Sequence, residues 1–272
     1  MSFEQVENLL SSHHINPKKL LGQNFMINTS LFSKLSEFAE LNCTDVVLDA
    51  GAGFGFLTRF LSNECKAVIA VEKDAQIFKV LKEQVKGLSN VKVVEGDFLE
   101  VTLPKFNKVV SIPPYYISSA MITWIFSRHV DCAIVIMQKE FGEKLVAKVG
   151  SEEYSWLTVL SSQRAKVEIL GPVPKNMFYP SPLVDSVVLR IIPYSKKLFE
   201  VKNEILFISL LKWLFSQRNK RLSNAIFPYL KSNFNLDKME AENIARSLAY
   251  SGTRVRELLP KEFGAIADAL PN

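Results

Sequence analysis

The central part of the chain alternates short β-branched runs with longer stretches of helical periodicity, and this alternation constrains the fold more than any other feature. The runs are continuous and apolar, which is typical of strands buried on both faces of a sheet. Strands that alternate with helices form parallel sheets with crossover connections, so the pattern predicts an α/β fold. The predicted strands are Val46–Ala50, Ala67–Val71, Val91–Glu95, Lys108–Ile112 and Cys132–Met137, and the predicted helices are Leu57–Ser62, Asp74–Lys86 and Ser119–Arg128.

The pattern changes near Pro193. Before it, two further predicted strands flank a proline-rich loop, Val167–Leu170 and Val184–Ile192, and we expect them to form an antiparallel hairpin at a sheet edge. After it, only helical periodicity is found. We therefore predict a first domain over residues 1–193 and a small all-helical domain over residues 194–272. The helices expected there are Glu204–Ser216, Ala225–Lys231, Lys238–Ala249 and Lys261–Leu270.

Length and composition allow one large core and a smaller appendage. The chain has 272 residues, of which 48% are hydrophobic, and a chain of this size buries a substantial core. Its 33 Lys and Arg residues against 28 Asp and Glu residues give a net charge of +5, which suits a polyanionic partner without establishing one. The first ten residues carry Glu4 and Glu7 and lack a signal-peptide core, and no later run could span a bilayer. We expect a cytoplasmic protein that makes no membrane contact.

The cysteines and histidines do not form a metal-binding pattern. The three cysteines, Cys43, Cys65 and Cys132, are far apart and form no Cys-x-x-Cys pair, so we expect reduced thiols and neither a zinc site nor a disulfide framework. His13 and His14 are adjacent in a polar stretch, and the third histidine is isolated. We therefore expect no metal.

Three consecutive predicted strands end in residues that suit a nucleoside. The first leads into Gly51-Ala52-Gly53-Phe54-Gly55, where glycines let the backbone turn tightly beside a ligand. This spacing differs from the dinucleotide fingerprint, and Asp49 without a lysine nearby favours a cationic ligand over a pyrophosphate. Glu72 ends the second strand, from where a carboxylate reaches ribose hydroxyls, and Gly96-Asp97-Phe98 follows the third. Each feature alone is equally compatible with a turn or a helix cap, but their joint position at strand ends favours a ligand site.

The fourth predicted strand leads into Ser111-Ile112-Pro113-Pro114-Tyr115-Tyr116. Prolines fix φ and remove N–H donors, so the carbonyls of this segment are rigid and few of them are used in a sheet ladder. Such a loop can present carbonyls to a planar amine with an aromatic ring alongside. On its own, the segment is also compatible with an ordinary proline-rich turn.

Together these motifs resemble those of S-adenosylmethionine-dependent methyltransferases that act on exocyclic amines. More narrowly, the chain resembles the ribosomal RNA adenine N6-dimethyltransferase family through Leu21-Gly22-Gln23-Asn24-Phe25, Gln138-Lys139-Glu140, Phe178-Tyr179-Pro180-Ser181-Pro182-Leu183-Val184-Asp185-Ser186 and Arg218-Asn219-Lys220-Arg221. The resemblance implies a Rossmann-like methyltransferase sheet with helices on both faces, a C-terminal helical domain, and S-adenosylmethionine as methyl donor. The cofactor-binding residues expected on this basis are Gln23, Asn24, Met26, Gly51, Gly53, Glu72, Lys73, Asp97, Phe98, Ser111 and Ile112.

The chain departs from this family at the residue that accepts a hydrogen bond from the adenine N6. The family pattern Asn-Leu-Pro-Tyr places Ile112 where asparagine is expected, and isoleucine has no side-chain acceptor. Three hypotheses follow: Ser111 Oγ or the carbonyls of Ile112 and Pro113 replace the asparagine, which we favour; catalysis is slower and stops at one methyl; or activity is lost. The catalytic candidates are Ser111, Ile112, Pro113, Pro114 and Tyr115, with Tyr115 stacked on a flipped adenine and Tyr116 interpreted as a loop aromatic.

Basic residues complete the predicted site. The candidate phosphate contacts are Lys18, Lys19, Arg218, Lys220 and Arg221, although solvated surface charge also explains each one. The resemblance implies N6-dimethylation of two adjacent adenines near the 3′ end of small-subunit rRNA, during ribosome biogenesis, by a monomer that binds this rRNA or a pre-30S-type ribosomal particle. The alternatives are a large-subunit rRNA adenine N6-methyltransferase and a noncatalytic, RNA-binding ribosome-assembly factor.

Overall fold

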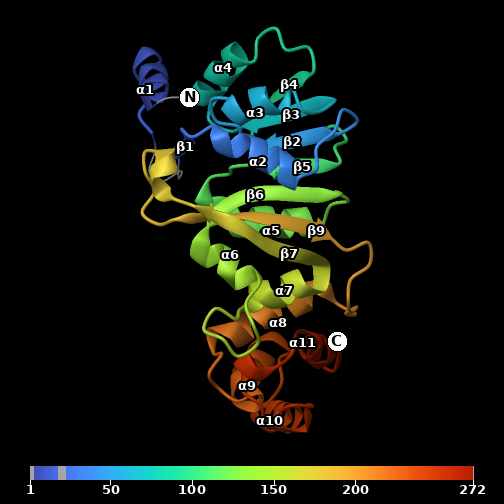
Figure 1. Cartoon of the computed structure of the whole chain (residues 1–272). Coiled ribbons are helices and arrows are strands. Elements are labelled where there is room, and N and C mark those ends of the chain that lie inside the picture. Colours follow the sequence, from blue (N-terminus) through green and yellow to red (C-terminus); the bar gives the residue numbers. More distant parts are fainter. Residues whose placement is uncertain (1–2, 18–22, 272) are drawn as a thin grey trace. The chain divides into compact units, whose positions relative to one another are not determined.

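The computed structural model of the protein describes residues 3–17 and 23–271 and divides into two compact units (Figure 1). The sheet unit comprises Met1–Gly142 and Lys166–Pro193, and the helical unit comprises Glu143–Ala165 and Tyr194–Asn272. The expected division assigned residues 143–165 to the first domain, whereas this segment packs within the helical unit. Tyr154 and Val159 explain the difference, because both are fully buried in the helical core.

The sheet unit is built on a seven-stranded sheet with the strand order β4-β3-β2-β5-β6-β9-β7. Its strands β2 to β6 are parallel along this order, and β9 is antiparallel to β6. Val71 of β3 lies opposite Ala50 of β2 and Val94 of β4, so the carboxyl ends of these three strands meet at one edge. The strands are β2 (Val46–Ala50), β3 (Ala67–Glu72), β4 (Val91–Glu95), β5 (Lys108–Ser111), β6 (Cys132–Gln138), β7 (Ala165–Val173) and β9 (Ser186–Pro193).

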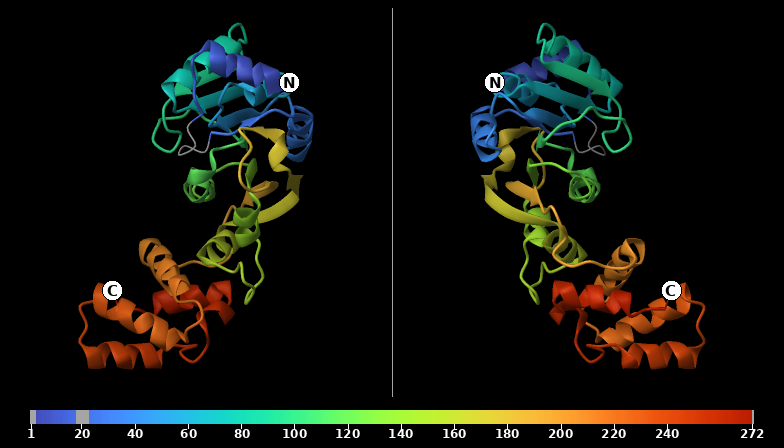
Figure 2. Two further views of the ribbon diagram at one scale, coloured as in Figure 1. Left: turned by 90° about the vertical axis from the view of Figure 1, so that its left-hand side faces the viewer. Right: turned by 90° about the vertical axis from the view of Figure 1, so that its right-hand side faces the viewer.

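Helices cover both faces of this sheet, with α2 on one face and α5 on the other (Figure 2). Phe32 and Leu35 of α2 and Leu61 of α3 pack in one buried cluster with Val47 and Val110 of the sheet. The structure confirms the predicted α/β fold, and β2, β3, β5 and β6 are largely buried as expected. The expectation was wrong for β4, which lies at the sheet edge and is only partly buried. The helices are α1 (Phe3–Ser12), α2 (Ser30–Phe38), α3 (Phe56–Leu61), α4 (Ala75–Gln84), α5 (Ser118–Phe126) and α6 (Lys139–Leu145), with α6 crossing the boundary between the units.

A second, two-stranded sheet ties the N-terminal segment to the proline-rich loop. In it, β1 (Phe25–Met26) pairs with β8 (Phe178–Tyr179), and Phe25 lies opposite Tyr179. The Phe25 ring stacks on Phe54 of the glycine loop, with ring centroids 4.2 Å apart. This pairing was not predicted, and it places the N-terminal segment beside the carboxyl edge of the main sheet.

The helical unit has its own core. Its helices are α7 (Trp156–Arg164), α8 (Glu204–Ser216), α9 (Leu222–Asn233), α10 (Lys238–Ser247) and α11 (Pro260–Asp268). Phe207, Leu211 and Ile226 are fully buried in it, and Tyr154 donates a hydrogen bond to the Leu258 carbonyl at 2.8 Å. The four predicted C-terminal helices are present: α8 has the predicted bounds, and the ends of the other three differ from the prediction by at most three residues. Helix α7 was not predicted.

Candidate cofactor and acceptor site

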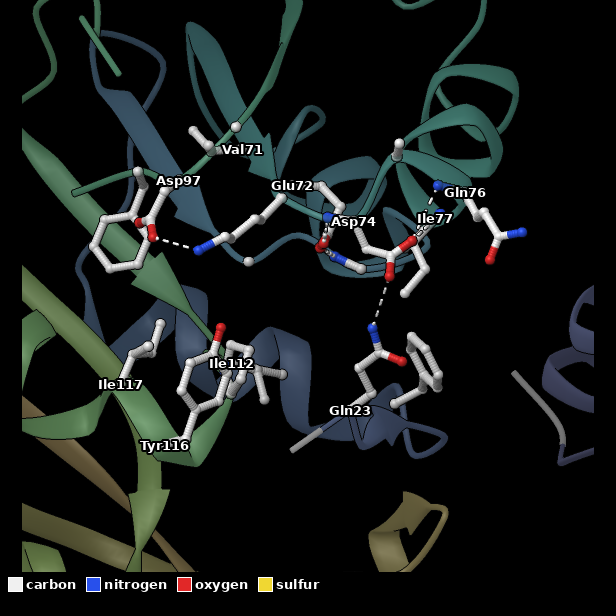
Figure 3. A pocket seen from close by; sticks show the side chains of 18 of the residues that line it. Gln23, Val71, Glu72, Asp74, Gln76, Ile77, Asp97, Ile112, Tyr116 and Ile117 are labelled. Carbon is white, nitrogen blue, oxygen red and sulfur yellow. Dashed lines mark hydrogen bonds and ion pairs between the residues drawn. The ribbon is translucent and has the colours of Figure 1, made fainter. Parts of the chain in front are cut away.

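A pocket of about 410 Å³ lies at the carboxyl edge of the sheet (Figure 3). Its walls come from the segments that follow β2, β3, β4 and β5, together with Gln23, Asn24 and Phe25. All three predicted strand-end motifs therefore meet in one cavity. Open α/β sheets bind ligands at this edge.

The glycine loop approaches the proline segment so closely that a Cβ at Gly51 would push against the Pro114 ring. Gly51 has φ +79°, and a Cβ added to it would lie 3.0 Å from Pro114 Cδ. The Gly51 and Ala52 N–H groups both donate to the Val71 carbonyl, at 2.8 and 2.9 Å. The loop is thus fixed against β3 and against Pro114, which leaves its backbone exposed to the pocket.

Glu72 occupies the position expected of a ribose ligand. One carboxylate oxygen accepts the Asp74 N–H at 2.8 Å, and the other accepts the Gly53 N–H at 3.0 Å. Burial raises the pKa of this carboxyl above its ordinary value, although the backbone donors oppose the shift. Each oxygen retains a second lone pair, so Glu72 can accept two ribose hydroxyls while its orientation stays fixed.

Asp97 and Lys73 form an ion pair at the pocket wall, with Lys73 Nζ 3.0 Å from Asp97 Oδ2. Although burial acts to raise the pKa of Asp97, the Leu99 N–H and Lys73 hydrogen bonds lower it below its usual value. Phe98 also lines the pocket and packs edge-on against Trp124. A carboxylate acceptor beside an aromatic ring is suited to an adenine base.

Gln23 and Asp74 lie across the pocket from Ile112, Tyr116 and Ile117 (Figure 3). Gln23 Nε2 donates to Asp74 Oδ2 at 3.4 Å, which links the N-terminal segment to the start of α4. Asn24 also lines the pocket, whereas Met26 lines a smaller adjoining cavity of about 50 Å³ instead. The structure therefore brings together nine of the eleven predicted cofactor residues in this pocket, and the other two, Met26 and Ser111, do not line it.

Asp49 is a buried acid beneath the glycine loop. Burial raises its pKa to about 7, the hydrogen bond from Thr58 Oγ1 at 2.7 Å opposes this shift, and the charge of Glu72 adds to it. Asp49 lines the small cavity, together with Gly51 and Ile112. A cation bound nearby would favour the ionised form of this carboxyl.

Ser111 and Ile112 face different surroundings. Ser111 is fully buried, and its Oγ donates to the Ala50 carbonyl at 2.6 Å. The Ile112 side chain lines both cavities. Ser111 therefore holds β5 against the end of β2, and its Oγ is already used in this hydrogen bond. Of our other favoured acceptors, the Ile112 carbonyl belongs to a residue that lines the pocket, whereas Pro113 does not line it.

The two tyrosines also differ in position. Tyr115 Oη is 2.5 Å from Ser186 Oγ, its ring packs edge-on against Phe178, and burial raises the pKa of its hydroxyl. Tyr116 is 54% exposed and lines the pocket. Stacking of an adenine on Tyr115 stays a prediction, but Tyr116 is more than a loop aromatic, because its ring forms part of the pocket wall.

The predicted basic residues of the helical unit lie near one another and have different partners. Arg218 donates to the carbonyls of Ser151 and Glu152, and Lys220 Nζ donates to Gln217 Oε1 at 2.7 Å. The exposed Arg221 precedes α9 and forms a β-bridge with Arg254. Arg254 and Arg256 join this cluster through hydrogen bonds to Asn219. The sequence analysis did not predict these two residues, because they are distant from Arg218–Arg221 in the chain.

Lys18 and Lys19 lie outside the described residues. Within residues 3–17 and 23–271, no group of three or more His, Cys, Asp or Glu side chains is arranged to hold a metal ion. None of the described helices is long and apolar enough to cross a membrane.

Comparison with known proteins decides the family. The family described as "Ribosomal RNA adenine dimethylase" matches residues 14–260. This chain belongs to that family. It is 37% identical to a probable ribosomal RNA small subunit methyltransferase A from Pyrococcus abyssi, over 96% of this chain and 95% of the relative. A relative of the same name from Methanopyrus kandleri is 38% identical over 83% of this chain and 81% of its own length.

Solved structures of the family share the fold. A dimethyladenosine transferase from Plasmodium falciparum superposes with a TM-score of 0.76 at 28% identity, covering 89% of this chain and 95% of that chain. The 23S rRNA methyltransferase ErmE superposes with a TM-score of 0.64 at 26% identity, covering 90% of this chain and 99% of that chain. The predicted family and the Rossmann-like methyltransferase fold are confirmed.

S-adenosylmethionine is the methyl donor of this family, and the residues present fit it. The glycine loop turns tightly at Gly51, where an added Cβ would lie only 3.0 Å from Pro114 Cδ, Glu72 offers two acceptor oxygens, and Asp97 with Phe98 offers a slot for a base. The acidic surroundings suit the positive charge of a sulfonium. The chain is accordingly an S-adenosylmethionine-dependent transferase.

Proposed function

We propose that this enzyme methylates the N6 atoms of two adjacent adenines near the 3′ end of small-subunit rRNA, up to two methyls each. The observation that carries the proposal is the single pocket in which Gly51, Glu72 and Asp97 meet the Ile112–Ile117 segment. The first group suits a nucleoside cofactor, and the second offers a wall for a base.

Each part of the pocket has a distinct role. Glu72 and Asp97 hold the ribose and adenine of the cofactor, and the Phe25–Phe54 stack closes the N-terminal side. When bound, S-adenosylmethionine supplies its sulfonium methyl: the N6 lone pair forms the N–C bond while the C–S bond breaks with its electrons on sulfur, and an N6 proton leaves to water. The proline segment positions the base, so catalysis depends on orientation and electrostatics.

The rigid proline segment also suits a flipped base. An adenine within a helix cannot reach a pocket of this kind unless it leaves its stack. The Tyr116 ring on the pocket wall offers a stacking surface, and the Tyr115 ring, which packs against Phe178, is the second candidate. The basic cluster of Arg218, Lys220, Arg221, Arg254 and Arg256 can contact phosphates of the same RNA.

The names of the curated relatives favour the small subunit over the large one. We expect the enzyme to act in the cytoplasm, as a monomer, on a pre-30S-type particle. The test supplies donor with a labelled methyl to small-subunit and large-subunit particles that lack the modification. Label in adenosines of the small-subunit rRNA alone supports the proposal, whereas label in the large subunit alone favours the alternative. Cofactor binding without transfer to either favours an assembly factor.

A further inference from the structure

The acceptor end of the pocket is lined mainly by hydrocarbon. Ile112, Pro114 and Ile117 line it together with Tyr116, whose hydroxyl is the one polar side-chain group among these four. The charged side chains of Glu72 and Asp97 follow other strands of the sheet. Figure 3 shows Ile112, Tyr116 and Ile117 together on one side.

Hydrogen-bond acceptors in this segment are few. Ser111 Oγ is fully buried and is directed to the Ala50 carbonyl. Pro113 and Pro114 have no N–H, and in the described part of the chain the carbonyls of Ile112 and Pro113 accept no hydrogen bond. Of these residues Ile112 lines the pocket and Pro113 does not, and the Pro114 carbonyl accepts the Ile117 N–H at 3.3 Å. The pocket-lining part of the segment therefore combines one free backbone acceptor, the Ile112 carbonyl, with the apolar Ile112 side chain.

These surroundings do not satisfy both N–H groups of an unmodified adenine amine. The amine carries two N–H groups that point in different directions in the plane of the ring, and an N–H that faces hydrocarbon loses its hydrogen bond to water without replacement. N6-methyladenine carries one N–H and one methyl group. A backbone carbonyl can accept from the N–H while the methyl contacts Ile112, so no polar group is left unpaired.

We propose that Ile112 makes N6-methyladenosine in RNA the preferred acceptor, so that the site is built for the second methyl transfer. The inference rests on the proposed function and specifies its substrate. In this step, N6 forms a bond to the donor methyl as the C–S bond breaks with its electrons on sulfur, and the single N6 proton leaves to water. The products are N6,N6-dimethyladenosine and the neutral thioether.

The test compares two short RNAs of the target sequence that differ only in an N6-methyl group on the target adenosine. Single-turnover methyl transfer should be about tenfold or more faster on the methylated RNA, the ratio expected from one unpaired N–H. Ile112→Asn, which restores a side-chain acceptor, should remove or reverse this preference. Ile112→Val keeps a hydrocarbon wall and should retain it.

Binding provides a readout that does not depend on catalysis. With S-adenosylhomocysteine present, competition by the two RNAs against a fluorescent RNA should show the same preference in the wild type and its loss in Ile112→Asn. Equal or inverted preference in the wild type overturns the inference while leaving the proposed function intact, provided that methyl is transferred. An Ile112→Asn variant that binds cofactor but keeps the wild-type preference overturns it too. Failure to methylate either RNA contradicts the proposed function itself.

Discussion

The backbone of Gly51 lies against the Pro114 ring, since a Cβ added to Gly51 would be 3.0 Å from Pro114 Cδ. This contact joins the cofactor loop to the acceptor segment. Either a substituted loop or the proline ring would have to move to relieve the overlap. Because Gly51 has no side chain, the cofactor loop packs directly against the Pro114 ring. This contact fixes the cofactor loop relative to the acceptor segment.

Gly51→Ala should weaken S-adenosylmethionine binding about tenfold or more, because it strains a backbone at φ +79° and displaces Pro114. Calorimetric titration measures the change. Gly87→Ala is the matched control, since Gly87 has φ +89° and nothing lies within 4 Å of its added Cβ. The control should share the conformational cost and bind cofactor normally. Equal loss in both variants would mean that strain, and not the Pro114 contact, limits binding.

Asp49→Asn should change the dependence of stability on pH. Because burial raises the folded-state pKa of Asp49 to about 7 from its ordinary 3.8, the folded protein holds a proton between these values that the unfolded chain has released. Its contribution to the unfolding free energy therefore falls as pH rises through this window and is constant above it. Urea unfolding should show Asp49→Asn gaining stability over the wild type between pH 5 and 7, by about 1.4 kcal/mol per pH unit.

The opposite sign is expected at Asp97, whose pKa lies below its usual value. Its ionised form stabilises the fold above the unfolded-state pKa, and this contribution is lost as pH falls. Asp97→Asn should therefore lose stability at neutral pH relative to the wild type.

For the Asp49 prediction, a difference in unfolding free energy between Asp49→Asn and the wild type that does not change with pH would show that Asp49 is ionised in the fold.

Tyr116→Ala should slow methyl transfer to RNA about tenfold or more, because loss of a stacked ring costs roughly 1–3 kcal/mol per base. Tyr115→Phe keeps its ring, loses the hydrogen bond to Ser186 Oγ, and should destabilise the fold by about 1 kcal/mol with little effect on transfer. Single-turnover kinetics and urea unfolding separate these effects. Normal transfer in Tyr116→Ala would assign the stacking role to Tyr115 alone.

Arg218 and Arg221 should have different roles despite their proximity. Arg218→Ala removes the charged donors of two carbonyls, those of Ser151 and Glu152, and should destabilise the helical unit by about 1–3 kcal/mol. Arg221→Ala should leave stability unchanged, weaken RNA binding and reduce the salt dependence of the affinity by about one phosphate contact. RNA titrations at several salt concentrations measure this. Unchanged affinity and salt dependence in Arg221→Ala would remove it from the RNA surface.

The sequence predicted the main sheet because most of its strands are continuous apolar runs, and it predicted the motifs at Gly51, Glu72 and Asp97 because parallel strands bring their ends to one edge. The expectation for Gln23, Asn24 and Met26 came from the family resemblance. It did not predict the two-residue pairing of β1 with β8, since the two segments are distant in the chain and too short to show periodicity. The direction of Ser111 Oγ was equally hidden, because its partner, the Ala50 carbonyl, belongs to a neighbouring strand. Likewise, the β-bridge between Arg221 and Arg254 could not be predicted, because tertiary packing brings together two residues that are distant in the sequence.

The most direct test of the account is mass spectrometry of nucleosides from small-subunit rRNA after incubation with the enzyme and donor carrying a deuterated methyl. The account predicts deuterated methyl groups on adenosine N6, with N6,N6-dimethyladenosine as the product that accumulates. An enzyme that binds S-adenosylmethionine yet leaves adenosines unlabelled, or that labels another base, would contradict it.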